Sequence, residues 1–569
     1  MIYRTEHPKP QFMRKNWQNL NGQWDFEIDH GNSGADRGLF AVDAKLSGKI
    51  NVPFCPESKL SGVEYTDFMT SVWYKRSFTV TPEQLEGCIR LHFGAVDYEA
   101  FVYINGKLCG KHRGGYVSFS FDITQFVQPG ENVLTLHATD DTRDRRIPAG
   151  KQSDQYASYG CFYTRTTGIW QTVWLEFLPK THIVKAKYFA DIHNGVLSVH
   201  ATLQGSGKLT ARATYEGHLM GQGSIDSCGG EAVLSLPLAE THLWEPGAGR
   251  LYDLELTYGD DLVESYFGMR TVSIDGYKVR INGKSVFQRL ILDQGFYPEG
   301  VYTAPSDREL QADIERTLAM GFNGARLHEK IFEERFLYHC DRLGYLVWGE
   351  FPNWGLDHTY ADSIYSVLPE WLEELDRDFN HPAIICWCPF NETWDKNGRK
   401  QYDDVLAMTY RTTKAIDPTR PCIDTSGMHH VITDIYDLHN YEQDPEKFAE
   451  QLKPVGDTNE LTFWTAFNKR QQYDGKVPFF VGEFGGTPWM NDPSGWGYSD
   501  TPESEEAFLA IFKGLVDAVL DHDKICGFCY TQLTDVEQEQ NGLYTYDRQP
   551  KFDPAILHKI VSRKAAIEE

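Results

Sequence analysis

The stretch 306–351 reads SDRELQADIERTLAMGFNGARLHEKIFEERFLYHCDRLGYLVWGEF and decides the fold class of the C-terminal half. The word SDRE is a capping box, and the apolar residues after it recur four positions apart, which predicts a helix. The run FNGARLH then reads as a strand. The pattern repeats, with a helix over 333–343, Gly344 as its C-cap, and a strand at Tyr345–Phe351. Alternating helices and strands predict βα units around a parallel sheet.

The same alternation extends from about residue 277 to the end of the sequence. Further strands are predicted at Leu290–Leu292, Ile384–Phe390, Cys422–Thr425, Ile435–Leu438, Phe479–Val481 and Ile525–Thr531. Together with the two strands above they make eight, with helices between most of them, in about 290 residues. That size and pattern predict a (β/α)8 TIM barrel.

The N-terminal half has a different pattern, with short alternating runs about every 8–12 residues and turn signals between them. Asn105-Gly106 joins the runs FVYI and KLCG and predicts a hairpin, because both residues tolerate positive φ. Gly168–Phe177 reads as one strand and is followed by a linker at Leu178–Lys180. About seven strands between residues 183 and 274 predict an immunoglobulin-like sandwich. The expected domains are 1–180, 181–276 and 277–569.

The composition of the 569 residues excludes several classes of protein. The net charge of −26 disfavours binding to nucleic acid, which needs clustered Lys and Arg. No apolar run approaches a membrane span, and the N-terminus lacks a secretory h-region. The 11 cysteines are scattered, and Cys526 and Cys529 lie in a strand-like segment, so buried thiols are expected there rather than a zinc or redox site. We therefore expect a cytoplasmic protein with no cofactor and no metal.

Three carboxylates follow or interrupt apolar runs at the predicted C-terminal ends of barrel strands, where barrel active sites lie. They are Glu350, Glu392 and Glu483. A carboxylate in such a place is costly unless it is partnered, so it is often functional. Glu350 has a structural alternative, a salt bridge to Arg326. Two carboxylates at one barrel mouth suit glycoside cleavage, in which one donates a proton and the other attacks the anomeric carbon or activates water.

Several local words resemble the signatures of glycoside hydrolase family 2. The segment Asn380–Glu392 (NHPAIICWCPFNE) resembles its acid/base signature, and Phe480–Gly485 (FVGEFG) resembles its nucleophile strand. The other matching words are FNGAR at 322–326, DRLGY at 341–345, GE at 349–350, LNGQW at 20–24, WYKR at 73–76 and GIWQ at 168–171. The resemblance implies a jelly-roll β-sandwich, an immunoglobulin-like β-sandwich and a catalytic barrel, in this order.

The resemblance also implies roles for single residues. Glu392 corresponds to the general acid/base, and Glu483 to the nucleophile of a retaining double displacement. Asn391 matches the donor to the sugar 2-hydroxyl, while Arg326 and Tyr441 match positions that hold the nucleophile. His328 is a looser match, because it lies two residues after the arginine instead of three. The apolar surroundings of Trp387 and Trp394 are expected to raise the pKa of Glu392.

The sugar is expected to be neutral. Relatives that take β-glucuronides carry an Asn-x-Lys pattern late in the barrel, and this chain has Glu537 and Glu539 in the matching stretch and no Lys. A β-galactoside is the first choice; α-L-arabinosides, β-galactofuranosides, β-glucuronides and β-mannosides stay open. Four tryptophans in predicted barrel loops are candidates for stacking on sugar or for packing: Trp354, Trp394, Trp464 and Trp489.

Two other functions are alternatives to a glycosidase. One is a catalytically inactive carbohydrate-binding protein on the same scaffold, against which the presence of both Glu392 and Glu483 argues. The other is a metal-dependent hydrolase that uses Glu350, Glu392 and His328. The expected partner is an oligosaccharide or another glycoside, not nucleic acid or membrane. The family resemblance also favours a homo-oligomer, with the N-terminal sandwiches as contact surfaces.

Overall fold

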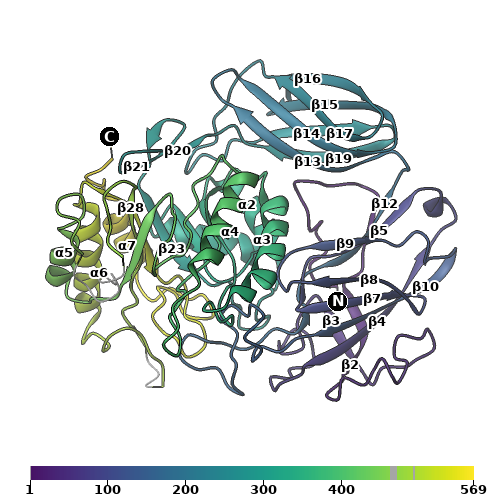
Figure 1. Ribbon diagram of the computed structural model, residues 1–569, viewed down its shortest axis with the longest axis horizontal. Helices are drawn as coiled ribbons and strands as arrows, with labels where there is room; N and C mark the ends of the chain where they lie inside the picture. Colours follow the sequence, from purple (N-terminus) through teal and green to yellow (C-terminus); the bar gives the residue numbers. More distant parts are fainter. Residues whose placement is uncertain (1, 462–470, 491–493, 569) are drawn as a thin grey trace.

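The computed structural model describes residues 2–461, 471–490 and 494–568, so the predicted site residue Trp464 lies outside the described residues. Figure 1 shows a sandwich that contains the N-terminus, a second sandwich beside it, and a helix-covered barrel that carries the C-terminal half. This is the arrangement of a jelly-roll sandwich, an immunoglobulin-like sandwich and a TIM barrel that the sequence predicts. Among the described residues, no helix has the length and apolar content that a membrane span requires.

The N-terminal sandwich consists of a four-stranded sheet in the order β1-β12-β5-β9 and a six-stranded sheet in the order β3-β2-β4-β10-β7-β8. Its core forms because alternate residues of each strand are apolar and point inward, as in β7. The elements are β1 Trp17–Asn19, β2 Gly22–Ile28, β3 Gly48–Val52, β4 Ser71–Val80, η1 Glu83–Glu86, β5 Cys88–Phe93, β6 Val96–Asp97, β7 Glu99–Ile104, β8 Lys107–Arg113, β9 Phe119–Asp122, β10 Gly130–Thr139, β11 Gly168–Ile169 and β12 Val173–Leu178.

Two local expectations have different outcomes in this sandwich. The hairpin at Asn105-Gly106 is confirmed, with φ of 51° and 77° at the two turn residues. The single strand predicted over Gly168–Phe177 is wrong, because it divides into β11 and β12. Trp170 leaves the ladder between them and packs its ring 5.3 Å from that of Tyr302, which belongs to the barrel. Its packing against the barrel replaces strand pairing at this point.

The second sandwich has the seven strands that the sequence predicts, in sheets ordered β13-β14-β17 and β16-β15-β18-β19. All neighbouring strands are antiparallel, and small and aliphatic side chains fill the space between the sheets. The strands are β13 His182–Asp191, β14 Val196–Gln204, β15 Gly207–Tyr215, β16 His218–Ser227, β17 Gly230–Pro237, β18 Tyr252–Tyr258 and β19 Asp261–Phe267.

The barrel follows a small sheet, β20-β21-β22, whose first turn contains the predicted domain boundary at residues 276 and 277. Its described strands run parallel in the order β26-β25-β24-β23-β29-β28-β27. The strands are β20 Val272–Asp275, β21 Lys278–Ile281, β22 Lys284–Ser285, β23 Gln288–Asp293, β24 Gly324–Leu327, β25 Leu346–Glu350, β26 Ile384–Cys388, β27 Tyr436–Asn440, β28 Phe479–Gly485 and β29 Ile525–Thr531. The helices are α1 Asp307–Ala319, α2 Glu334–Leu343, η2 Ala361–Ser363, α3 Ile364–Asp378, α4 Asp403–Ile416, α5 Pro445–Leu452, α6 Glu505–Leu520 and α7 Pro554–Val561.

The helix caps of the opening stretch form as predicted. Ser306 accepts a hydrogen bond from the backbone N–H of Glu309 at the start of α1, and Gly344 ends α2 with a φ of 66°. The strand predicted at Cys422–Thr425 is wrong. This segment lies between β26 and β27 and makes isolated bridges only, including Trp387 with Cys422. Its Asp424 carboxylate accepts backbone N–H groups from the following loop, so a loop replaces the regular strand.

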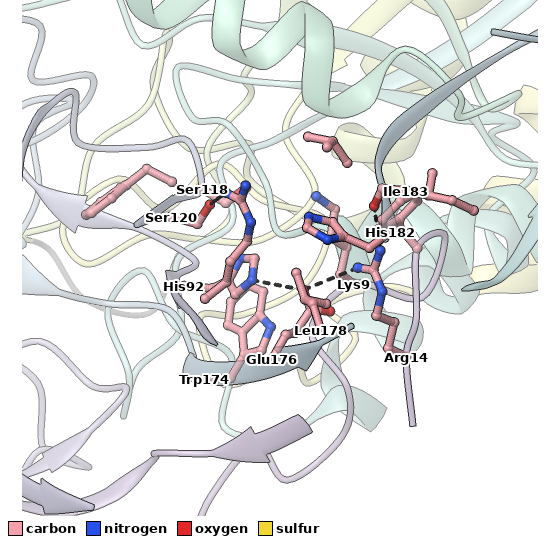
Figure 2. A pocket seen from close by; sticks show the side chains of 14 residues that line it. Lys9, Arg14, His92, Ser118, Ser120, Trp174, Glu176, Leu178, His182 and Ile183 are labelled. Atoms are coloured by element: carbon pink, nitrogen blue, oxygen red, sulfur yellow. Dashed lines mark hydrogen bonds and ion pairs between the residues drawn. The ribbon is translucent and has the colours of Figure 1, made fainter. Parts of the chain in front are cut away.

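A small cavity of about 120 Å³ lies where the two sandwiches meet (Figure 2). Glu176 on β12 points into it, with its carboxylate 2.9 Å from His92 Nε2 and 3.5 Å from Arg14 Nη1. The Arg14 guanidinium also makes two hydrogen bonds of 2.8 Å to Asp261 on β19. We call Arg14, His92, Glu176 and Asp261 the junction cluster. Because its members come from both sandwiches, it ties the two together.

Candidate active site

The polar residues chosen from the sequence come together at the C-terminal ends of the barrel strands. Glu350 is the last residue of β25, and Glu483 lies in β28 opposite His439 of β27. Glu392 follows β26 and has a φ of 45°, and its backbone N–H donates to the Ser426 carbonyl over 2.9 Å. Parallel strands end at one edge of the barrel, so residues far apart in sequence meet there.

Glu392 and Glu483 flank a single imidazole. His439 Nδ1 lies 2.6 Å from Glu392 Oε1 and 3.4 Å from Glu483 Oε2. One carboxylate oxygen from each glutamate and one ring nitrogen of His439 all lie within 4.8 Å of one another. This is close to the carboxylate separation of about 5–5.5 Å in retaining glycosidases. Glu392 keeps 15% of its side chain exposed and Glu483 only 6%, so the pair is buried but reachable.

Glu483 is held on both of its oxygens. Tyr441 donates its hydroxyl to Oε2 over 2.5 Å, and Arg326 Nη1 lies 3.2 Å from Oε1. The Tyr441 ring stacks on Tyr498 with the ring centroids 3.5 Å apart. These contacts fix the orientation of the carboxylate.

Arg326 lies beneath the carboxylate pair with 0% of its side chain exposed. It pairs with Glu350 through Nε and donates to Asn391 Oδ1 over 2.9 Å. Glu350 is as deeply buried and also lies 3.3 Å from His328 Nδ1. The polar atoms of both residues contact neighbouring side chains, and for Glu350 this is the salt-bridge alternative. Contact of Arg326 or Glu350 with substrate stays a prediction.

The electrostatics around Glu392 also differ from expectation. Burial by itself raises the pKa of Glu392, but the hydrogen bond and charge of His439, with the charges of Lys151 and Arg326, bring it below its ordinary value. The expected rise is therefore wrong for this conformation. Trp387 lies behind the site and donates to Asp417. Trp394, 43% exposed, adds little desolvation.

The two histidines of the site have opposite shifts. Burial lowers the pKa of His439, but the charges of Glu483, Glu392 and Asp437 raise it above its ordinary value. The pKa of His328 is well below its ordinary value, first because of burial and then because of the positive charge of Lys151. The surroundings therefore favour the cationic form of His439 and the neutral form of His328.

Asn391 is clamped beside Glu392. Its N–H donates to Asn353 Oδ1 over 2.6 Å, and its carbonyl accepts from Asn353 Nδ2 and from Trp354 Nε1 over 2.9 and 3.1 Å. Its buried side-chain Nδ2 has no hydrogen-bond partner within the described part of the chain. That nitrogen is the donor that a ligand hydroxyl would meet.

The tryptophan candidates lie in different surroundings. Trp394 lies two residues after Glu392, the acid/base candidate, and is half-exposed. Trp354 packs beside Asn391 and against Phe162, with ring centroids 5.2 Å apart. Trp489 packs on Phe508 of α6, with ring centroids 6.1 Å apart, which favours the packing alternative for this residue.

Glu537 and Glu539, which stand where the β-glucuronide pattern has a lysine, both form hydrogen bonds to neighbouring residues. Glu537 turns to the N-terminal sandwich, where it accepts the N–H of Thr164 over 3.0 Å. Glu539 is buried, and its carboxylate accepts the Tyr163 hydroxyl and Asn541 Nδ2. Burial raises the pKa of Glu539 above its ordinary value. The charge of Glu483 also contributes to this rise.

The ligand set expected for a metal-dependent hydrolase does not assemble. In the ranges that the structure describes, the one group with metal-ligand spacing is Glu392, His439 and Glu483. Glu350 and His328 bond to each other instead, and the Arg326 guanidinium beside Glu483 opposes a second cation. Cys526 and Cys529 are buried thiols in β29, as the sequence predicts.

Three residues at this site were not selected from the sequence. His439 follows a predicted strand, and that position was its only signal. Asn353 carries no motif of its own. Lys151 belongs to the N-terminal sandwich, so the pattern of barrel strand ends does not predict it as a site residue. Its charge nevertheless acts on Glu392, Glu483 and Glu539. Tertiary structure alone brings Lys151 to the barrel.

Relatives by sequence are glycosidases of two specificities. A β-galactosidase of Thermoanaerobacter pseudethanolicus is 27% identical over 66% of this chain, and the β-glucuronidase of Rattus norvegicus is 27% identical over 72%. The chain spans 52% of the first relative's length and 68% of the second's. Among solved structures, β-glucuronidase of Ruminococcus gnavus superposes with a TM-score of 0.79, covering 98% of this chain and 100% of that one, at 20% identity. This last similarity concerns the fold alone.

Two family models match the chain in the order that the structure shows. The sugar binding domain of glycosyl hydrolases family 2 matches residues 17–175, and the TIM barrel domain of the same family matches residues 303–461. The first covers the N-terminal sandwich, and the second contains Arg326, Glu350, Glu392 and His439. With both models matched and the three-part fold in place, the chain belongs to glycoside hydrolase family 2.

Proposed function

We propose that the protein is a retaining exo-glycosidase that hydrolyses a terminal neutral glycoside, with a β-galactoside as the first choice. The observation that carries this proposal is the carboxylate pair: Glu392 and Glu483 flank one imidazole with ligand atoms within 4.8 Å. An inverting enzyme needs carboxylates about 6.5–9.5 Å apart to hold a water between them and the sugar. The shorter spacing supports direct attack by one carboxylate.

In the first step, Glu483 attacks the anomeric carbon while the bond to the leaving oxygen breaks. Glu392 gives its proton to that oxygen, and the sugar becomes an ester of Glu483. Arg326 and Tyr441 keep Glu483 oriented for this attack. The available Nδ2 of Asn391 donates to the 2-hydroxyl, a contact that strengthens in the transition state.

In the second step, Glu392 takes a proton from water, and the water oxygen attacks the anomeric carbon. The ester bond breaks, Glu483 regains its charge and the sugar leaves with retained configuration. His439 Nδ1 lies 2.6 Å from Glu392 Oε1 and orients this carboxyl group for both proton transfers. His439 acts as a positioning residue for Glu392.

A neutral glycone is favoured over a uronide by Glu539. Its buried carboxylate acts electrostatically on Glu483, and a uronate placed beside it would meet like charge. The β-glucuronidases among the relatives make a uronide the alternative substrate. Aryl β-galactoside, β-mannoside, α-L-arabinoside, β-galactofuranoside and β-glucuronide, compared by kcat/KM, discriminate between these sugars, and we expect a neutral one to lead.

The mechanism is tested with Glu392→Ala. This variant is expected to lose hydrolysis of the preferred aryl glycoside and to regain turnover with azide, which needs no general base. The product is a glycosyl azide of retained configuration, identified by NMR. Matched Glu255→Gln, on the exposed face of the second sandwich, retains full activity without azide. A glycosyl azide of inverted configuration contradicts the double displacement.

A further inference from the structure

One cation next to the carboxylate pair comes from outside the barrel. Lys151 belongs to the segment between β10 and β11 and is only 6% exposed. Its Nζ lies 3.6 Å from the ring centroid of Trp354. The same ring donates through Nε1 to the carbonyl of Asn391, over 3.1 Å. A single indole therefore separates the ammonium group from the residue that precedes Glu392.

The backbone around Lys151 is fixed on both sides. The N–H of Gly150 donates to the carbonyl of Trp354 over 3.1 Å, and the carbonyl of Lys151 accepts the N–H of Tyr163 over 2.7 Å. Gly150 has a φ of 54°, and a Cβ there would come within 2.5 Å of a barrel carbonyl oxygen. The close docking of this segment on the barrel places the ammonium group and limits its movement.

The ammonium group of Lys151 is charged and has N–H donors available for a ligand. Burial lowers the pKa of Lys151, but the neighbouring Cys161, Glu539 and Glu483 raise it above its ordinary value. Within the described ranges, Lys151 forms no ion pair and no hydrogen bond through Nζ; its contact is the face of Trp354. A buried ammonium group with free N–H donors can bind a polar ligand.

A hydrogen-bond acceptor, Glu539, is connected to Lys151 through Tyr163. Tyr163, whose N–H binds the Lys151 carbonyl, donates its hydroxyl to the Glu539 carboxylate. Gln294 and Gln532 continue this hydrogen-bonded chain inside the barrel. Lys151 and Glu539 thus offer a charged donor and a charged acceptor that are connected through Tyr163, beside the Glu392–Glu483 pair.

We propose that Lys151 donates a hydrogen bond to a glycone hydroxyl and that Glu539 accepts one, so that the N-terminal sandwich completes the sugar-binding site. This inference rests on the proposed glycosidase function and makes Lys151 a specificity-determining residue. A hydroxyl both donates and accepts, so it suits this pair, whereas a uronate suits Lys151 only. Loss of a hydrogen bond to a charged group reduces kcat/KM by about 10–100-fold.

The test measures kcat/KM of Lys151→Met for the preferred aryl glycoside and its monodeoxy analogues. We expect a loss of about 10–100-fold with the parent sugar and little further loss with one of the deoxy sugars, because that sugar already lacks the partner hydroxyl. Lys151→Arg, which keeps charge and donors, recovers part of the loss. Lys107→Met, at an exposed position in the same sandwich, serves as control. An equal loss for the parent and every deoxy sugar overturns the proposal.

Two further measurements separate this inference from the proposed function. Trapping with a 2-fluoro glycoside, followed by peptide mass analysis, reports a glycosyl ester on Glu483 in wild type and Lys151→Met alike. An absent ester in wild type rejects the function itself, whereas an ester without hydroxyl-specific coupling rejects only the role of Lys151. In Glu539→Gln the ratio of uronide to neutral-sugar kcat/KM is expected to rise, because Lys151 then faces no competing carboxylate. An unchanged ratio contradicts the role of Glu539.

Discussion

The molecule contains two buried clusters of Arg, His and carboxylate side chains, one between the two sandwiches and one in the barrel. The junction cluster ties the two sandwiches together, and the mouth cluster, defined as Arg326, Glu350, Glu392, His439 and Glu483, lies at the barrel strand ends. In the junction cluster, His92 and Arg14 hold Glu176, and Arg14 also pairs with Asp261. In the mouth cluster, two carboxylates compete for one histidine, and one of them is partly exposed.

The comparison teaches that burial and a shifted pKa do not identify an active site by themselves. Burial by itself raises the pKa of Glu176, but His92 and Arg14 lower it to about 2. The pKa of Glu392 is also lowered by a neighbouring histidine and by cationic side chains, so the direction of the shift is the same in both clusters. In the junction cluster two carboxylates also share a cation, since Glu176 and Asp261 both contact Arg14, but they come from the two different sandwiches and join them. The mouth cluster has a surplus of carboxylates and the open donor of Asn391, and these leave room for a substrate.

The largest expected effect distinguishes the clusters by activity. Glu483→Gln removes the proposed nucleophile, so kcat is expected to fall by about 10⁴–10⁶-fold on the preferred aryl glycoside. The same isosteric change in the junction cluster, Glu176→Gln, is expected to leave kcat within about twofold below its unfolding temperature. Steady-state kinetics of both variants test the contrast. Comparable losses in the two variants would break it.

The next effect distinguishes the clusters by stability. The pKa of Glu176 is about 2 in the folded state, against 4.5 ordinarily. A lowered folded-state pKa stabilises the protein fully above pH 4.5, and this stabilisation is lost as pH falls toward 2. Glu176→Gln is therefore expected to reduce the free energy of unfolding by about 2–3 kcal/mol at pH 7, and by less at pH 3.

Urea denaturation at both pH values measures this difference, with Glu255→Gln as the control on an exposed strand position. Glu483→Gln is expected to change the free energy of unfolding by less than Glu176→Gln does, because Arg326 keeps its pair with Glu350. An effect of Glu176→Gln that does not diminish at pH 3 would show that the cluster stabilises the junction by packing and not by charge.

Much of the barrel and its carboxylates was predictable because the signals are local. Glu350 and Glu483 stand in apolar strand runs, so their placement follows from the strand pattern. The segment Cys422–Thr425 has the same apolar pattern and still forms no strand, because the Asp424 carboxylate binds the next loop. The hydrophobic pattern of a segment does not show whether one of its side chains will bind the backbone of a following loop.

The rest of the site depends on contacts between distant segments. The direction of the pKa shift at Glu392 is determined by His439, 47 positions further along the chain. Lys151 reaches the site because its neighbour Gly150 docks on the Trp354 carbonyl. Sequence motifs point to the proposed catalytic pair, Glu392 and Glu483, through the strand ends and the family resemblance. They do not show that Glu392 and His439 share a proton, or that the N-terminal sandwich contributes Lys151 to the site.

The smallest effect concerns the shared histidine, the feature that most separates the two clusters. Since His439 lowers the pKa of Glu392 by hydrogen bond and charge, His439→Gln is expected to raise it. The general acid acts in its protonated form, so the alkaline limb of the kcat/KM profile moves up by about one pH unit. His92→Gln makes the same change in the junction cluster and leaves the profile in place. If the alkaline limb of His439→Gln stays or moves to lower pH, His439 does not tune the acid, and the shared imidazole would serve both carboxylates through geometry alone.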